Sequence, residues 1–315
     1  FIPMCALNKV KGMGLIMKRF LRRNIVVIII LLVFGVFFLY GDYQVIQNNQ
    51  DVVELTNNLQ EQCKTKVITD EEEKKFCHEI LTNRVIEPDF YSEFSEVLVW
   101  YIQTVAYFLF LIVIIPPMIP ICKMLRNRYI MNTNLRESYR SFIKKMLFTA
   151  YKYLWILPVL VIILIIPLLM NYSLVPEYSV VYNMGWSTNL INYPVLFFIL
   201  YLLNVVILSM IYVNISLVVA RFQHKFIPCI ILSYIVFFSF EIFLETVVRV
   251  IILQRIFHTE LGMIFNIMDI FGFNDLYGIG SLFLVNISFL IISFVFVYLA
   301  YKNKEKLVIQ CEKNK

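Results

Sequence analysis

The sequence predicts an all-α, polytopic membrane protein with six transmembrane helices, a small extracellular helical hairpin and a re-entrant segment before the last span. Of its 315 residues, 60% are hydrophobic and 16% are charged, and the mean hydropathy is +0.75. A soluble domain of this size has no need of so much apolar surface. Apolar runs near twenty residues recur along the chain, and each is long enough to cross roughly 30 Å of hydrocarbon. Basic and acidic residues are segregated into alternate loops between these runs, and an alternating bias of Lys and Arg is typical of a membrane protein.

The expected spans are the six apolar runs. They comprise residues 24–40, 97–121, 154–170, 194–220, 226–253 and 281–301. The first run follows the basic sequence KRFLRRN and could be mistaken for a signal peptide. However, its apolar part is long and no small-residue cleavage site follows before Gly41, so we expect a signal anchor that is retained.

The charge distribution orients the spans. With six crossings, residues 1–23, 122–153, 221–225 and 302–315 lie on one side and contain 21 of the 28 Lys and Arg residues but only 3 of the 22 acidic residues. The positive-inside rule therefore predicts a multi-pass plasma-membrane protein with both termini in the cytoplasm. The basic residues lie where anionic lipids would attract them, so we expect membrane lipids, and not nucleic acid, as partners.

The largest soluble segment comprises residues 41–96, which we expect outside the cell as a helical hairpin. Its first helix is predicted near residues 51–63, and a second begins at Thr69, where Thr69 and Glu72 form a capping box. Cys63 and Cys77 flank the turn between these helices. On the oxidising side they could form a disulfide that stabilises the hairpin by about 3 kcal/mol, or they could remain two free thiols. A shorter outer loop is expected at residues 171–193.

A basic helix is expected within the cytoplasmic loop of residues 122–153. Asn134 followed by Glu137 is a helix-start signal, and the residues that follow place basic side chains on one face. This helix either contacts anionic lipid and fixes topology, or docks a soluble partner, and the two roles are compatible. The residues that would contact a partner are Arg136, Glu137, Tyr139, Arg140 and Phe142.

Polar residues also occur inside the fourth run. They are Asn204, Ser209, Asn214 and Ser216. Amides and hydroxyls inside a bundle usually form hydrogen bonds between helices, so we favour a packing role over a transport path.

The fifth run carries three charges at a spacing of four, which places them on one helix face: Glu241, Glu245 and Arg249. Glu245 and Arg249 can pair in the favourable orientation, which leaves Glu241 in need of another partner. These charges are either solvated at the membrane interface or line and gate an outward-opening path. After Glu241 the helix is expected to bend or to be followed by a re-entrant element, within residues 254–280, that is covered by protein or lines a wet cavity.

The sequence lacks the motifs for ATP hydrolysis and for metal binding. There is no G-x-x-x-x-G-K-[ST] phosphate loop, so any ATP hydrolysis must occur on a separate chain. The three histidines, His78, His224 and His258, are far apart in the expected topology, and no Cys or His spacing suggests a metal. We therefore expect neither an enzyme nor a cofactor.

The order of these segments resembles the permease subunit of type 2 ATP-binding-cassette (ABC) exporters, over nearly the whole chain. A basic N-terminal segment, an acidic outer domain after span one, a basic helical loop after span two and a re-entrant segment before span six all match that family in order. The resemblance implies a homodimer or heterodimer of permeases driven by an ABC ATPase, with residues 134–145 as the coupling segment. It also implies that Glu241, Glu245 and Arg249 begin an outer re-entrant hairpin. The coupling segment lacks the glycine that many members carry beside a glutamate. The alternative is a membrane immunity or sensor protein that binds a peptide or lipid without transport.

Overall fold

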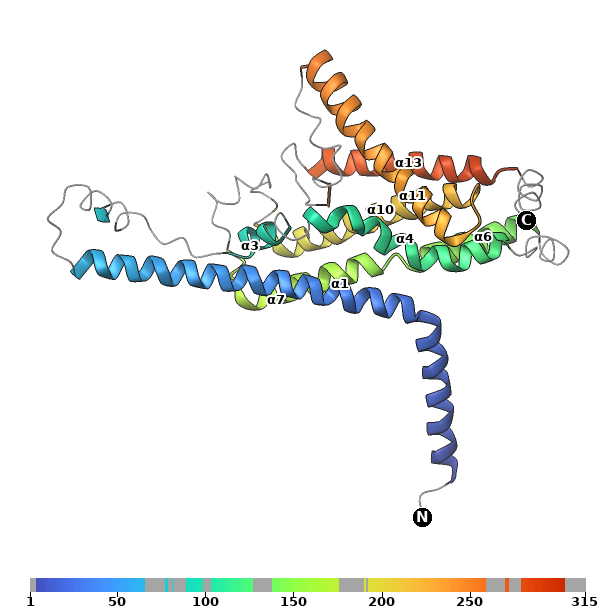
Figure 1. The fold of residues 1–315 in the computed structure, drawn as a ribbon, viewed down its shortest axis with the longest axis horizontal. Coiled ribbons are helices and arrows are strands. Elements are labelled where there is room, and N and C mark those ends of the chain that lie inside the picture. Colours follow the sequence, from blue (N-terminus) through green and yellow to red (C-terminus); the bar gives the residue numbers. More distant parts are fainter. Residues whose placement is uncertain are drawn as a thin grey trace.

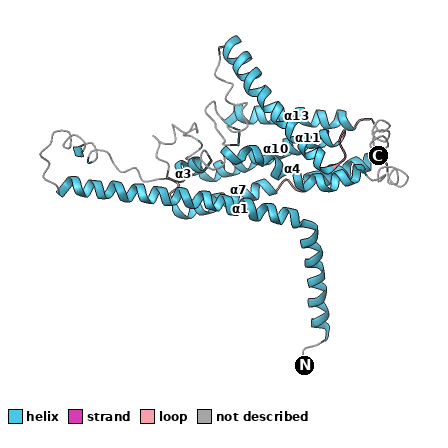
Figure 2. Ribbon diagram, in the orientation of Figure 1, coloured by secondary structure: helices cyan, strands magenta, loops and turns pink. Residues whose placement is uncertain are grey.

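The computed structural model describes residues 4–65, 77–78, 81, 89–98, 103–126, 138–175, 190, 192–258, 270–271 and 279–303. In this part of the chain, all of the regular elements are helices (Figure 2). They are α1 (Met4–Thr65), α3 (Phe90–Val97), α4 (Gln103–Arg126), α6 (Tyr139–Tyr151), α7 (Ile156–Asn171), α10 (Pro194–Ala220), α11 (Phe226–Phe243), the π-helix η2 (Leu244–Ile256) and α13 (Ile279–Tyr301).

Six helical segments are long and apolar enough to cross a membrane, which confirms the predicted class. They are Asn24–Thr65, Tyr107–Leu125, Tyr139–Asn171, Pro194–Ala220, Phe226–Ile256 and Ile279–Tyr301. The fourth coincides with the predicted span, and the sixth differs from it by two residues. Hydropathy locates these helices well because a lipid-facing helix needs apolar residues around its whole circumference.

The helix of the first span does not end near Tyr40. Helix α1 continues for 62 residues to Thr65, about 93 Å at 1.5 Å per residue, and leaves the bundle at one end (Figure 1). The helix predicted at residues 51–63 is therefore the extension of span one, since a single glycine at position 41 does not interrupt a helix. The predicted second arm, which begins at Thr69, lies largely outside the described residues.

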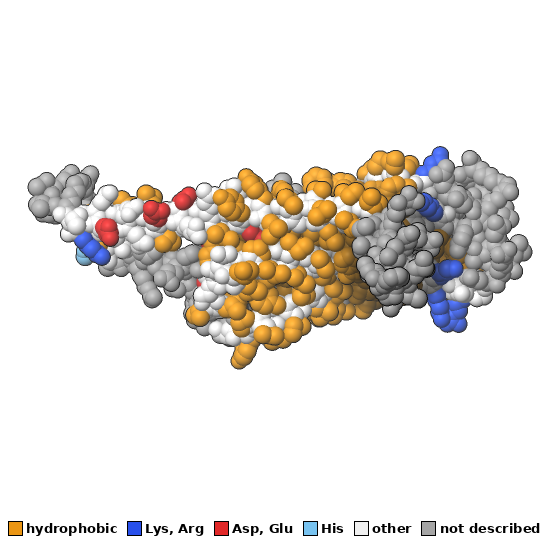
Figure 3. Space-filling view, turned by 90° about the horizontal axis from the view of Figure 1, so that it is seen from below, with side chains coloured by type: hydrophobic (Ala, Val, Ile, Leu, Met, Phe, Trp, Pro, Cys, Tyr) orange, Lys and Arg blue, Asp and Glu red, His pale blue; other side chains and the backbone are white. Residues whose placement is uncertain are grey.

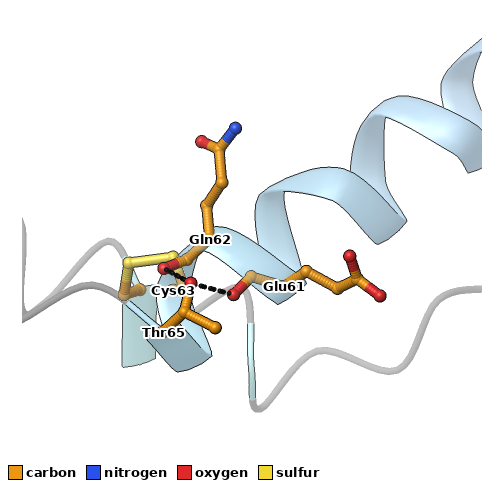
Figure 4. The surroundings of a disulfide bond; sticks show 5 residues. Glu61, Gln62, Cys63 and Thr65 are labelled. Carbon is orange, nitrogen blue, oxygen red and sulfur yellow. Dashed lines mark hydrogen bonds between the residues drawn. A yellow bond between two sulfur atoms is a disulfide. The ribbon is translucent and has the colours of Figure 1, made fainter.

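The disulfide between Cys63 and Cys77 is present, with 5.4 Å between the two Cα atoms. It joins the last turn of α1 to the short described segment at residues 77–78. The Thr65 hydroxyl donates to the Glu61 carbonyl (2.9 Å) and approaches that of Gln62, which closes the helix end beside the bridge (Figure 4). In the bundle, Cys122 and Cys229 are buried and form no disulfide.

The second predicted span overlaps two described helices. Residues 90–97 form α3 and residues 103–126 form α4, and Tyr107–Leu125 is the part of α4 that is long and apolar enough to cross a membrane. Asp89 starts α3 because its carboxylate accepts the backbone N–H of Ser92 (2.8 Å) and its carbonyl accepts that of Glu93 (3.2 Å). The aromatic rings of α3 then pack on α10, with Phe94 against Tyr201 at 5.3 Å between ring centroids. The predicted start of the span at residue 97 stays a prediction, since residues 99–102 lie outside the described residues.

Helix α10 lies at the centre of the bundle. It packs against α13, α4, α11 and α7, while α1 packs against α7 and α3. The buried core includes Leu160, Leu164, Val205, Tyr212 and Leu217. The position of α10 explains why its polar residues Asn204, Ser209, Asn214 and Ser216 are fully buried.

Helix α11 does not break at Glu241. It passes into η2, and the combined helix runs to Ile256 obliquely across α13, in orange in Figure 1. The helix therefore continues past Glu241, where no Gly or Pro follows before Ile256, and its geometry changes from α to π at Leu244. Most of residues 254–280 lie outside the described part, but Ile270 and Phe271 are buried in the bundle.

Charge separates along the molecule. Figure 3 shows acidic side chains toward one end, most of the visible Lys and Arg side chains at the other, and a hydrophobic belt between them. We call these the acidic end, which carries Glu54 and Glu93, and the basic end, which carries Lys123, Arg140 and Lys225. The belt has the character expected of a lipid-facing surface.

Candidate functional site

The basic helix α6 begins at Tyr139. The hydroxyl of Ser138 caps it by accepting the backbone N–H of Ser141 at 3.3 Å. Asn134, the predicted start, and the candidate residues Arg136 and Glu137 lie outside the described residues. The polar face of α6 therefore presents Arg140 and Lys144 as exposed basic side chains.

Two of the predicted partner-binding residues face inward. Phe142 is buried against the bundle together with Met146 and Ala150, which follow it at intervals of four. The Tyr139 hydroxyl donates to the backbone carbonyl of Tyr301 at 2.6 Å. Phe142 was expected to contact a partner, but its ring is buried in the interface between α6 and the chain's own core.

A chain of hydrogen bonds connects α6 to α10 and α13. At the C-terminal end of α6, the Tyr151 hydroxyl donates to Asn214 Oδ1 (2.5 Å), and Asn214 Nδ2 donates to Ser293 Oγ (2.8 Å). Asn214 is fully buried. An amide that accepts from one helix and donates to another fixes the spacing of all three, so the predicted packing role of Asn214 is confirmed.

The basic ends of α10 and α13 are joined by side chains that bind backbone carbonyls. Arg221 Nε donates to Ala300 O (2.9 Å), and the Tyr301 hydroxyl donates to Leu217 O (2.8 Å). These bonds satisfy carbonyls in the last turn of each helix. His224 contacts Ala220 O through Nδ1 (2.8 Å), and burial, together with the neighbouring Arg221, lowers the pKa of its imidazole. Displacement of α6 would therefore act on α10 and α13 as one unit.

An apolar groove lies between α10, α11 and α13. Its volume is about 280 Å³, at the lower edge of the range for small-molecule sites. The described residues that line it are Ile211, Asn214, Ile215, Val218, Val236, Phe240, Phe289, Ile292, Ser293 and Phe296. Asn214 and Ser293 also belong to the hydrogen-bond chain from α6, so the groove and the basic helix are physically connected.

A small cavity adjoins the groove toward the acidic end. It holds about 20 Å³, enough for one water-sized group, and shares Ile211, Ile215, Phe240 and Phe289 with the groove. Its polar lining includes Glu241 and Asn286. Glu241, which the sequence left either solvated at the interface or lining a path, is therefore among the residues that line this internal cavity, and Asn286 lines it with Glu241.

Amide groups close this cavity. Asn286 Nδ2 donates to Asn204 Oδ1, and Asn204 Nδ2 donates to Ile270 O at 2.6 Å. Asn204 lies about 15 Å along α10 from its start, so the backbone at Ile270 enters the bundle to that depth. Such backbone must be covered by protein, which is the condition expected for a re-entrant segment. Asn286 Oδ1 is buried and has no hydrogen-bond partner among the described residues.

The other charged residues of the fifth span lie on η2. Glu245 accepts from Arg249 in the ion pair predicted by their spacing, and both are half-buried. Neither lines the groove or the small cavity, which separates this pair from Glu241.

A second hollow of about 570 Å³ lies at the acidic end, between α1 and the end of α7. Five carboxamide side chains line it: Asn49, Gln50, Asn57, Asn58 and Asn171. Asn49 also donates to the Glu93 carboxylate. Burial, reinforced by nearby Glu96 and Asp89, raises the pKa of Glu93 to about 8 despite this hydrogen bond.

Within the described residues, no group of three His, Cys, Asp or Glu side chains is arranged to hold a metal ion. No known protein family, characterised protein or solved structure matches this chain. The elements that the structure connects are α6, the hydrogen-bond chain, the groove and the small cavity.

Proposed function

We propose that this chain is the membrane-spanning permease subunit of an ABC exporter, driven by a separate ATPase that docks on α6 and the residues before it. The observation that supports this most directly is the chain from Tyr151 to Asn214 to Ser293. It links an exposed basic helix to the two helices that line an apolar groove. A helix that only contacted lipid headgroups would have no need of buried polar bonds into that groove.

The proposed mechanism has three steps. The ATPase binds the exposed side of α6 through Arg140, Lys144 and the adjacent Arg136. Nucleotide-driven movement of the ATPase shifts α6, whose apolar face and two tyrosine hydroxyls are fixed to the bundle. Since α10 and α13 are joined at the basic end, both move together and the groove changes shape against α11. In this proposal the groove opens sideways onto a second permease, identical or homologous, in a plasma membrane with both termini cytoplasmic.

The test is a pull-down in mild detergent from the native host, followed by mass spectrometry. Wild-type protein should recover a P-loop ATPase, and the double reversal Arg136→Glu with Arg140→Glu should lose it. Lys225→Glu is the matched control, because Lys225 is exposed at the same end but lies in the turn between α10 and α11. Absence of an ATPase from a well-folded wild-type preparation would overturn the exporter proposal.

The hollow at the acidic end favours one second candidate, a membrane sensor or immunity protein. Carboxamides both donate and accept hydrogen bonds, which suits the uncharged backbone of a peptide. If this candidate is correct, a peptide binds outside, no ATPase is recovered, and replacing Asn57 and Asn58 by Ala abolishes the response without affecting insertion.

A further inference from the structure

We propose that the groove between α10, α11 and α13 binds the aliphatic chain of a primary-amine amphipath, with its ammonium group in the small cavity between Glu241 and Asn286. This inference rests on the proposed export function, for which it names the substrate class. The nature of the two adjoining cavities is the main argument for it.

The groove has the size and apolar lining that an aliphatic ligand chain needs. Apart from Asn214 and Ser293, its described lining is aliphatic or aromatic, and those two side chains bond to each other. The groove follows α10 from Ile211 to Val218, about 10 Å of helix. A flexible alkyl chain of that reach fits about 280 Å³ of apolar space without leaving a polar group unpaired.

The small cavity has two hydrogen-bond acceptors for the ligand's head group. Asn286 Oδ1 is a buried acceptor without a hydrogen-bond partner in the described structure, and it lines the same 20 Å³ space as the Glu241 carboxylate. A carboxylate accepts at several lone pairs, so Glu241 can receive a further donor whatever else it contacts. An ammonium group carries three donors and no acceptor, and it can satisfy both oxygens at once.

Charge selects the amine over other head groups. No Lys, Arg or His is among the described residues that line either cavity. A sulfate, phosphate or carboxylate head would face Glu241 without a compensating cation, which is unfavourable in a low-dielectric site. A hydroxyl head could donate to only one of the two oxygens. The ammonium head gains a charge-assisted hydrogen bond in addition.

The test uses purified full-length protein in nanodiscs of zwitterionic lipid, without any ATPase. The probe is decylamine with a photoreactive diazirine at the tail end, compared with the decanol and decyl sulfate of the same design. We expect the amine probe to label the far end of the groove, at Val218 or Phe296, and decylamine to compete. Labelling by the sulfate probe should be absent, and labelling by the alcohol should be at least about tenfold weaker, since a hydrogen bond to a charged group contributes that much or more.

Two variants make the test specific. Glu241→Gln should reduce labelling by the amine about tenfold or more and remove the preference for amine over alcohol. Glu245→Gln should leave both unchanged, because Glu245 lies outside the two cavities. Circular dichroism and gel filtration establish that each variant is folded.

Equal labelling by amine and alcohol, or an amine signal unaffected by Glu241→Gln, would overturn the proposal and identify a bilayer lipid chain as the occupant. The result is separable from the exporter test. Amine-selective labelling without a recovered ATPase would keep the site and remove the transport role. A recovered ATPase without amine selectivity would keep the transport role and remove this substrate class.

Discussion

Tyr151→Phe removes one oxygen atom and tests whether α6 is tied energetically to the groove. The hydroxyl donates to Asn214 Oδ1 over 2.5 Å, and Asn214 is fully buried. Without the Tyr151 hydroxyl, Asn214 Oδ1 loses this hydrogen bond, and an unpaired buried acceptor costs about 1–3 kcal/mol. Side-chain hydrogen bonds between membrane helices average closer to about 0.6 kcal/mol and reach about 1.7. We therefore expect a loss of about 1 kcal/mol in the free energy of unfolding.

The assay is reversible unfolding in mixed SDS micelles, arranged as a double-mutant cycle of Tyr151→Phe with Asn214→Leu. Because both changes remove the same bond, their effects should fail to add by about 0.5 kcal/mol or more. Tyr298→Phe makes the same chemical change at an exposed position and serves as the control. Additive effects in the cycle would refute the connection between α6 and α10, and with it the mechanism built on that bond.

Three further predictions concern the acidic end and the topology. A reporter active only outside the cell should work when fused near Asn57 and fail near Arg136, and activity at the latter position would reverse the orientation. Cys63→Ser should lower stability by about 3 kcal/mol, the chain-entropy value for a loop of this length, and non-reducing alkylation should leave the wild-type pair unlabelled. Burial raises the pKa of Glu93 from its ordinary 4.5 to about 8 in the folded protein, so the folded state binds the extra proton. Stability should therefore fall as pH rises from about 4.5 through 8, and Glu93→Gln should flatten that slope in thermal melts while the exposed Glu61→Gln does not.

The sequence was sufficient for features that depend on local pattern. The spans follow from runs of apolar residues, and the ion pair of Glu245 with Arg249 follows from a spacing of four on a helix. The bridge between Cys63 and Cys77 was one of two alternatives, and topology alone could not choose between them. The buried amides in span four were recognised as packing residues because an amide in hydrocarbon needs a partner.

Features that depend on which helix faces meet were not predictable in the same way. Phe142 was expected at a partner surface because it lies on a helix with basic residues. A signal against this was present: Phe142, Met146 and Ala150 form an apolar stripe at intervals of four, which indicates a face that the bundle buries. The length of α1 was missed for another reason. Its continuation past Gly41 depends on the absence of a strong helix breaker over many residues, and no single motif marks it.

The groove shows most clearly why site residues were harder to predict than the fold. Its two polar neighbours, Glu241 and Asn286, are 45 positions apart, and their proximity depends on how α11 and α13 cross beside α10. Glu241 was identified because a carboxylate in an apolar run is unusual, whereas an asparagine in a span ordinarily indicates packing. Asn286 does pack, through Nδ2 on Asn204, but its carbonyl oxygen remains unpartnered among the described residues. A buried acceptor is unfavourable unless something donates to it, so the same side chain that fixes the bundle also defines the chemistry of the ligand it can accept.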